Sequence, residues 1–234
     1  QELRSELKQE AAMKYYPIFL DIKDKDCLIV GGGKVGARKA ATLEKCGANV
    51  RVISDRFSHK FDELEKSSIC LEKKKYEQKD IKGMFFVFAA TNNTNLNWQI
   101  KQDASLLNIL CNVADAPDNS DFLLPSIVDR GDLVVAVSTS GSSPAMAKKI
   151  RKDLENYFGH EYEQFLLLMR NIRKKLLSSG RAPDDNKLIF NCLIAKGILE
   201  LIQSSDDLKI NAILCDVLGK EYIYEDLVSS RSDE

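Results

Sequence analysis

Apolar and polar positions follow two alternating patterns along the first half of the chain. Short apolar runs rich in Val, Ile and Phe are typical of buried parallel strands, and the stretches between them have the character of helices. The pattern predicts strands near 27–30, 49–54, 69–75, 84–90 and 108–113, and helices near 35–46, 57–67 and 94–106. Strands and helices that alternate at this spacing indicate a parallel sheet, with binding loops at the carboxyl ends of its strands.

The pattern changes after residue 121. Two extended runs, 122–129 and 133–138, predict an antiparallel hairpin, in which Pro125 favours an edge or a bulge. From Pro144 onward the pattern is helical; we expect Ser205 to cap a last helix that ends near Gly219, and the acidic tail after 224 to fray. We therefore expect an α/β protein with three regions, 14–120, 121–155 and 156–234.

The first predicted strand breaks into glycines and then enters a helix-forming stretch. In this order Gly31 permits a tight turn, Gly33 lets the backbone approach a pyrophosphate, and Gly36 lets helix and strand pack closely. Phosphate charge would rest on free amide groups at the helix start. The pattern predicts a Rossmann-type dinucleotide site, and the alternative is a plain strand-to-helix turn.

An acidic residue, Asp55, follows the second predicted strand, at about the 20-residue spacing expected for a carboxylate that accepts the adenosine ribose hydroxyls. An acid there favours NAD over NADP, because it would repel a 2′-phosphate. Arg56 weakens this preference, since an arginine at this place can pair with the extra phosphate. The alternative for Asp55 is a loop acid or a helix cap.

The loops after the fourth and fifth predicted strands are expected beside the glycine loop. They contain Thr91 and Asp115. A carboxylate at Asp115 could take a proton as hydride leaves a substrate, and the alternative is an Asx-turn acid before Pro117. The chain has two histidines, His59 and His160, both in charged surroundings, so a histidine base is less favoured.

A hydroxyl-rich segment precedes the first helix of the second half. Ser143 suits an N-cap and Pro144 the first helical position, so hydroxyls and free amides would face an anion such as a carboxylated or phosphorylated ligand. Positive charge follows on the same helix, and Arg130 lies in the expected hairpin turn. The alternative is a well-capped helix with a solvated basic face. The candidate anion-binding residues are Arg130, Ser138, Thr139, Ser140, Gly141, Ser142, Ser143, Lys148 and Lys149.

Composition excludes several classes of function. The chain has 34 basic and 35 acidic residues and a formal charge of −1, so nothing in its overall charge favours nucleic acid or an anionic membrane. Its six cysteines form no C-x-x-C pair, no run approaches the roughly 18 apolar residues of a membrane span, and the charged N-terminus lacks a signal-peptide core. We expect a cytoplasmic protein with reduced cysteines, and no zinc site, serine or cysteine triad, P-loop or nucleic-acid module.

Several separate segments, in order, resemble the siroheme synthase N-terminal family, over roughly residues 14–155. They are Tyr16–Leu20, Cys27–Gly36, Ala89–Asn92, Asn112–Asp115, Phe122–Ile127 and Val135–Pro144. That family contains precorrin-2 dehydrogenases, some of which also act as sirohydrochlorin ferrochelatases. Its members often have alanine where this chain has Gly36.

The resemblance implies NAD-dependent oxidation of precorrin-2 to sirohydrochlorin, in a homodimer whose hairpin and helical region cross between subunits. Asp115 matches the family's essential aspartate, which assists proton removal in dehydrogenation and, in bifunctional members, as ferrous iron enters. The family's cofactor-contact positions correspond to Lys34, Val35, Asp55, Arg56, Ala90 and Thr91. The substrate carries several carboxylates, and the resemblance therefore implies that the segment 138–143 binds them. The residues that would bind a metal ion stay unknown. The alternative function is that of a non-catalytic NAD-sensing regulatory module. Such a module would need neither Asp115 nor the segment 138–143.

Overall fold

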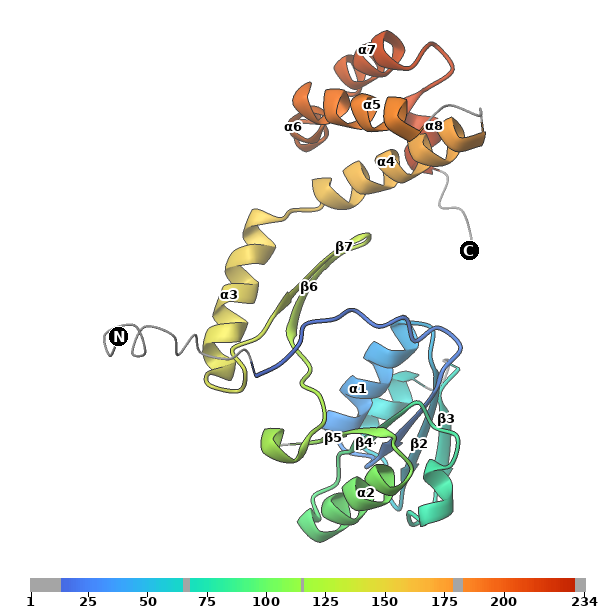
Figure 1. Ribbon diagram of the computed structural model, residues 1–234, viewed down its shortest axis with the longest axis vertical. Coiled ribbons are helices and arrows are strands. Elements are labelled where there is room, and N and C mark those ends of the chain that lie inside the picture. The colour runs from blue at the N-terminus through green and yellow to red at the C-terminus, as the bar shows by residue number, and fades with distance from the viewer. Residues whose placement is uncertain (1–13, 65–67, 115, 179–182, 230–234) are drawn as a thin grey trace, which may run out of the picture. The chain divides into compact units, whose positions relative to one another are not determined.

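The computed structural model describes residues 14–64, 68–114, 116–178 and 183–229. The chain divides into two compact units, residues 1–124 and residues 125–234 (Figure 1). The division into three regions that we expected from the sequence stays a prediction.

The first unit is built on a five-stranded parallel sheet, as the alternating pattern predicted. Its strands are β1 (Asp26–Val30), β2 (Asn49–Ser54), β3 (Cys70–Lys73), β4 (Phe86–Ala89) and β5 (Leu110–Val113), in the order β3-β2-β1-β4-β5. The chain runs outward from β1 to β3 and then returns to the other side of β1. The strand order therefore reverses between β1 and β4, which is where α/β sheets of this kind bind their ligands.

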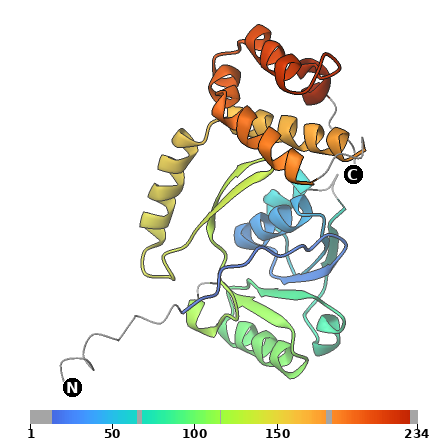
Figure 2. The same ribbon diagram turned by 45° about the horizontal axis from the view of Figure 1, so that its top comes forward.

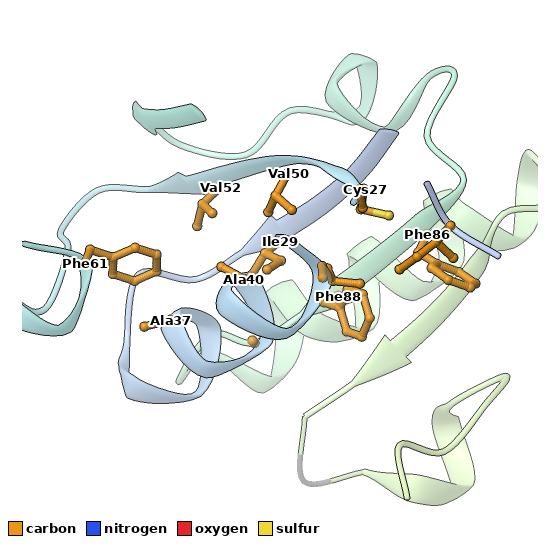
Figure 3. Close-up of a cluster of buried hydrophobic side chains, with 13 residues drawn as sticks. Cys27, Ile29, Ala37, Ala40, Val50, Val52, Phe61, Phe86 and Phe88 are labelled. Atoms are coloured by element: carbon orange, nitrogen blue, oxygen red, sulfur yellow. The ribbon is translucent and has the colours of Figure 1, made fainter. Parts of the chain in front are cut away.

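Helices cover both faces of this sheet because side chains on each buried strand alternate between two cores. Cys27 and Ile29 of β1 face α1 (Lys34–Lys45), in the cluster that Figure 3 shows. Leu28 and Val30 face the opposite core, which includes Ile100 of α2 (Thr94–Leu106). All these strand side chains are almost fully buried, and burial of each large aliphatic one contributes about 1.5–3 kcal/mol. The two cores fix the strand ends, and with them the loops that form the site.

Three short 3₁₀ helices connect the rest of this unit: η2 (His59–Leu64), η3 (Gln78–Ile81) and η4 (Pro117–Asn119). The helix predicted near 57–67 is present only in part, because the described part of that range forms the shorter 3₁₀ helix η2. Phe61 is its one buried side chain and packs edge-on against Phe57, with ring centroids 5.2 Å apart. A single apolar anchor does not provide the continuous apolar stripe of an amphipathic α-helix.

The outer edge of β5 is occupied by the segment that follows η4. Asp121 pairs with Cys111 in both directions: its backbone N–H donates to the Cys111 carbonyl at 2.9 Å, and its carboxylate accepts the Cys111 N–H at 2.8 Å. The Ser120 hydroxyl accepts the N–H of Val113 at 2.9 Å. Lys101 holds the other oxygen of the Asp121 carboxylate at 2.5 Å. Side chains therefore take the place of a sixth strand.

The second unit contains the predicted hairpin and a helical bundle (Figures 1 and 2). Strands β6 (Ser126–Arg130) and β7 (Leu133–Val137) are antiparallel, and β6 begins directly after Pro125, which has no N–H to donate. The helices are α3 (Pro144–Tyr157), α4 (Glu161–Ser178), α5 (Pro183–Ala195), α6 (Ile198–Gln203), α7 (Asp207–Val217) and α8 (Tyr224–Ser229). Helices α4 to α8 share one apolar core.

Two expectations for the end of the chain are wrong. Asp206, not Ser205, caps α7, because the Asp206 side chain accepts the N–H of Lys209 while Ser205 has a positive φ of 56°. Residues 224–229 of the tail that we expected to fray form α8, whose Tyr224 and Leu227 are buried in the core. Of the described helices, none is long and apolar enough to cross a membrane.

Candidate functional site

A cleft of about 890 Å³ lies at the carboxyl edge of the parallel sheet. The loops after β1, β2, β3 and β4 form its walls, as expected for a ligand site at the point where the strand order reverses. Its lining residues include Gly31, Gly32, Gly33, Asp55, Arg56, Ser58, Lys74, Lys75, Tyr76, Ala90, Thr91 and Asn93. A hollow of about 650 Å³ at the opposite ends of β4 and β5 has Lys82 as its one ionisable lining residue, so we assign the ligand to the first cleft.

The three consecutive glycines of the loop after β1 have different roles. Gly31 has a φ of 129°, and a Cβ on it would overlap the carbonyl oxygen of Ala90. A Cβ on Gly32 would overlap the carbonyl oxygen of Arg56, while one on Gly33 would meet no atom within 4 Å. Gly31 and Gly32 are therefore required by the packing of the loop itself. Gly33 leaves open space, which is the condition for a ligand to approach the backbone.

Helix α1 begins directly at this open space. Gly33 is its N-cap and has no side chain to bond the first amide groups, and the first helical bond runs from the Ala37 N–H to the Gly33 carbonyl at 3.0 Å. The N–H groups of Lys34 and Val35 therefore have no acceptor within the helix. Together with the positive end of the helix dipole, they favour an anion such as a pyrophosphate.

Gly36, in the first turn of α1, is buried, and a Cβ on it would overlap the Gly31 carbonyl oxygen. Gly36 thus lets helix and strand pack closely, as the sequence predicted. Its replacement by alanine would need a shift of the loop backbone.

The turn after β2 is fixed against the glycine loop. The Ser54 hydroxyl donates to the Arg56 carbonyl at 2.7 Å, and the Ser58 N–H donates to the Gly32 carbonyl at 2.8 Å. These bonds place Asp55 and Arg56, both exposed, at the rim of the cleft. The Ser58 hydroxyl is buried and has no partner among the described residues. Ser58 was not foreseen from the sequence.

A buried amide holds the loop after β4, and sequence reasoning missed it. Asn97, in α2, is only 6% exposed. Its Oδ1 accepts the Thr91 hydroxyl at 2.6 Å and the Thr91 N–H at 3.2 Å, and its Nδ2 donates to the Thr91 carbonyl at 3.0 Å. Asn97 shares the buried face of α2 with Ile100 and Ala104. A polar residue at helical spacing on an apolar face was the signal that could have found it.

Asp115 lies outside the described residues. Its neighbours continue from β5: the Ala114 N–H donates to the Ala89 carbonyl at 2.8 Å, and the Ala116 N–H donates to the Val113 carbonyl at 3.3 Å. Asn112, buried near the end of β5, accepts the Lys39 ammonium at 2.9 Å.

These residues fit a dinucleotide. The open space at Gly33 and the free amides of α1 suit a pyrophosphate, and the Asp55 carboxylate suits ribose hydroxyls. The buried Ser58 hydroxyl offers a further polar contact in the same cleft. Within the described residues, no group of three or more His, Cys, Asp or Glu side chains could hold a metal ion.

The predicted anion-binding residues lie in the second unit. Ser143 caps α3 as expected, because its hydroxyl accepts the Met146 N–H at 3.2 Å. The Thr139 hydroxyl donates to the Ser143 carbonyl at 3.0 Å and so closes the loop. The hydroxyl-bearing Ser140 and Ser142 are exposed, as is Gly141 between them, and the Ser138 hydroxyl accepts the Ser140 N–H at 3.1 Å.

The basic residues near this loop differ in their surroundings. Lys148 is exposed, and Lys149 forms an ion pair with Asp153 at 3.1 Å. Arg130 donates to the carbonyls of Phe158 at 2.7 Å and of Glu155 at 3.0 Å. Its guanidinium therefore caps the end of α3, where the helix dipole favours a cation.

Two family models match consecutive parts of the sequence. The one described as "Putative NAD(P)-binding" matches residues 18–126, and the one described as "Sirohaem biosynthesis protein central" matches residues 130–157. Siroheme synthase from Nitrosococcus oceani is 40% identical over 174 residues, which make up 73% of this chain and 37% of that protein. Siroheme synthase from Citrobacter koseri is 39% identical over 192 residues, 80% of this chain and 42% of that protein. The chain spans about two fifths of the length of these relatives.

Among solved structures, "SirC, precorrin-2 dehydrogenase" is similar with a TM-score of 0.62 and 25% identity, over 76% of this chain and 88% of that one. The resemblance that the sequence motifs indicated is thereby confirmed. The family models, the relatives and this structure agree, and the chain belongs to the siroheme synthase N-terminal family.

Proposed function

We propose that the chain catalyses the NAD-dependent dehydrogenation of precorrin-2 to sirohydrochlorin. The observation that carries this proposal is the cleft at the end of the parallel sheet, with open space at Gly33, in a chain that is similar to SirC over most of that protein's length. The names of the curated relatives, siroheme synthases, support the same pathway.

In this proposal the first unit holds the cofactor. The amides of Lys34 and Val35 bind the pyrophosphate, and Asp55 binds the adenosine ribose. The nicotinamide end lies beside Ala90 and Thr91, where Asn97 keeps the loop in place. When bound, NAD supplies the acceptor for the hydride that leaves the macrocycle. Asp115 takes the accompanying proton from the substrate, so that two electrons and two protons leave precorrin-2 in all.

The substrate's carboxylates bind the second unit in this proposal. The exposed hydroxyls of Ser140 and Ser142, with the nearby cations Lys148 and Lys149, provide donors and positive charge for a polycarboxylate. We also propose a homodimer, because one face of the hairpin leaves apolar side chains such as Ile127 and Val134 exposed.

The test is anaerobic incubation of the purified chain with precorrin-2 and NAD, followed by absorbance spectroscopy. We expect the sirohydrochlorin spectrum to appear together with NADH at 340 nm in equal amounts. Tight NAD binding without turnover would contradict the enzyme and favour the NAD-sensing module instead. A second arm adds ferrous iron, as a substrate, to purified sirohydrochlorin; formation of siroheme would add ferrochelation to the activity.

The matched variant for this assay is Asp115→Asn, which keeps the size of the side chain and removes its basicity. We expect loss of dehydrogenation by at least about a hundredfold, with NAD affinity within a factor of about three. Near-normal turnover would remove Asp115 from the proton transfer and leave the cofactor assignment intact.

A further inference from the structure

Two cations flank the single acid at the rim of the cleft where the adenosine ribose is expected. Arg56 follows Asp55 at the end of β2, and Lys75 follows the end of β3. All three side chains are exposed, and all three residues line the cleft. A ribose site that bound only unphosphorylated NAD would need the carboxylate and neither cation.

The sheet register brings the ends of β2 and β3 to the same level. β2 and β3 are parallel neighbours in which Ser54 pairs with Lys73, and the Lys74 N–H donates to the Ser54 carbonyl at 3.0 Å. Arg56 and Lys75 come two residues after Ser54 and Lys73 in the sequence, and both line the same cleft. The bond from the Ser54 hydroxyl to the Arg56 carbonyl fixes the backbone of this turn.

The neighbouring acidic side chains do not neutralise Arg56 and Lys75, because each of these acids is already paired with another cation. Asp80 binds Lys74 at 2.6 Å and Glu77 binds Lys79 at 2.6 Å. Glu72 lies 3.4 Å from Arg51 and 3.7 Å from Lys74. In the part of the chain that the structure describes, Arg56 and Lys75 form no ion pair, so the rim carries more positive than negative charge around Asp55.

We propose that Arg56 and Lys75 form a subsite for a 2′-phosphate, so that the cleft binds NADP as well as NAD. This inference rests on the proposed dinucleotide cofactor. Asp55 accepts the ribose hydroxyls of NAD, whereas in NADP the guanidinium and the ammonium hold the phosphate and offset its repulsion by Asp55.

The experiment is isothermal titration calorimetry of NAD and NADP against the full chain and three variants. For the parent we expect the Kd of NADP to lie within about thirtyfold of that of NAD. In the double variant Arg56→Ala/Lys75→Ala, the Kd of NADP should rise by a factor at least about tenfold larger than the factor by which the Kd of NAD rises. Asp55→Asn should improve NADP binding and weaken NAD binding. Lys73→Ala, an exposed lysine of β3 that does not line the cleft, should change neither.

A Kd for NADP more than about thirtyfold above that of NAD in the parent overturns the subsite. Equal weakening of both dinucleotides in the double variant also overturns it, because the cations would then serve the shared part of the ligand. Absence of NAD binding to the parent, by contrast, refutes the proposed function itself.

Discussion

The glycine that faces open space gives the sharpest test of the cofactor site. Gly33 has a φ of −83° and a ψ of −177°, an extended conformation that any residue adopts, and a Cβ on it would meet no atom within 4 Å. Gly33 is also the N-cap of α1, a position at which aspartate and serine are preferred. Gly33→Asp should therefore leave the stability of the chain unchanged or raise it by a few tenths of a kcal/mol.

The same change should damage NAD binding, because it places a negative charge beside the pyrophosphate. Two like charges about 4 Å apart repel by about 4 kcal/mol at an effective dielectric constant of about 20. Gly33 is exposed, so we halve this to about 2 kcal/mol, or about thirtyfold in Kd. Gly33→Ser adds similar bulk without charge and should cost less affinity. Only the loss in the aspartate variant should shrink as salt is added.

Calorimetry gives the Kd for each variant, and a thermal melt gives its stability. Unchanged NAD affinity in Gly33→Asp would place the cofactor elsewhere. A fall in Tm of more than about 5 °C in both variants would show that Gly33 is needed for folding. Gly31→Ala is the contrasting control: its Cβ overlaps the Ala90 carbonyl at a positive φ, so this variant should lose stability.

Three further predictions concern other parts of the chain. Asn97→Leu removes the partner of the loop after β4 and should lower stability by about 2–4 kcal/mol in urea unfolding; a loss below about 1 kcal/mol would contradict its role. Lys148→Glu/Lys149→Glu should raise the KM for precorrin-2 at least about fivefold with the Kd of NAD unchanged, whereas equal effects on both would indicate a solvated basic face. Burial raises the pKa of Cys27 and of Cys111 from 9.0 to about 11. Because the unfolded thiols release protons first, stability should fall as pH rises from 9 to 11, and a flat urea midpoint across that range would refute this.

Helices and strands of the first unit could be predicted because the apolar positions in the sequence are the positions that are buried in the fold. Helix α2 has the predicted bounds, since Ile100 and Ala104 mark its buried face and Asn93 caps it. Strand β4 was evident because all four of its side chains are buried, which requires a continuous apolar run.

The features that the sequence did not reveal depend on contacts between distant segments. Gly32 is required because the Arg56 carbonyl packs against it, and nothing near either residue signals that contact. Lys75 becomes part of the cleft only because β3 ends beside β2. Helix α8 was missed because its acidic residues suggested a tail, although Tyr224 and Leu227 stand three positions apart on one buried face.

The sheet of the first unit is also protected against pairing with other chains. An outer strand with free N–H and C=O groups is a template for aggregation. At β5 the side chains of Ser120 and Asp121 bond the backbone N–H groups of Val113 and Cys111, so a foreign strand would have to displace them first. The other outer strand, β3, is four residues long and leads into three consecutive lysines, 73–75, which repel a second copy of the same edge. Both outer strands of this sheet thus disfavour edge-to-edge association with another chain.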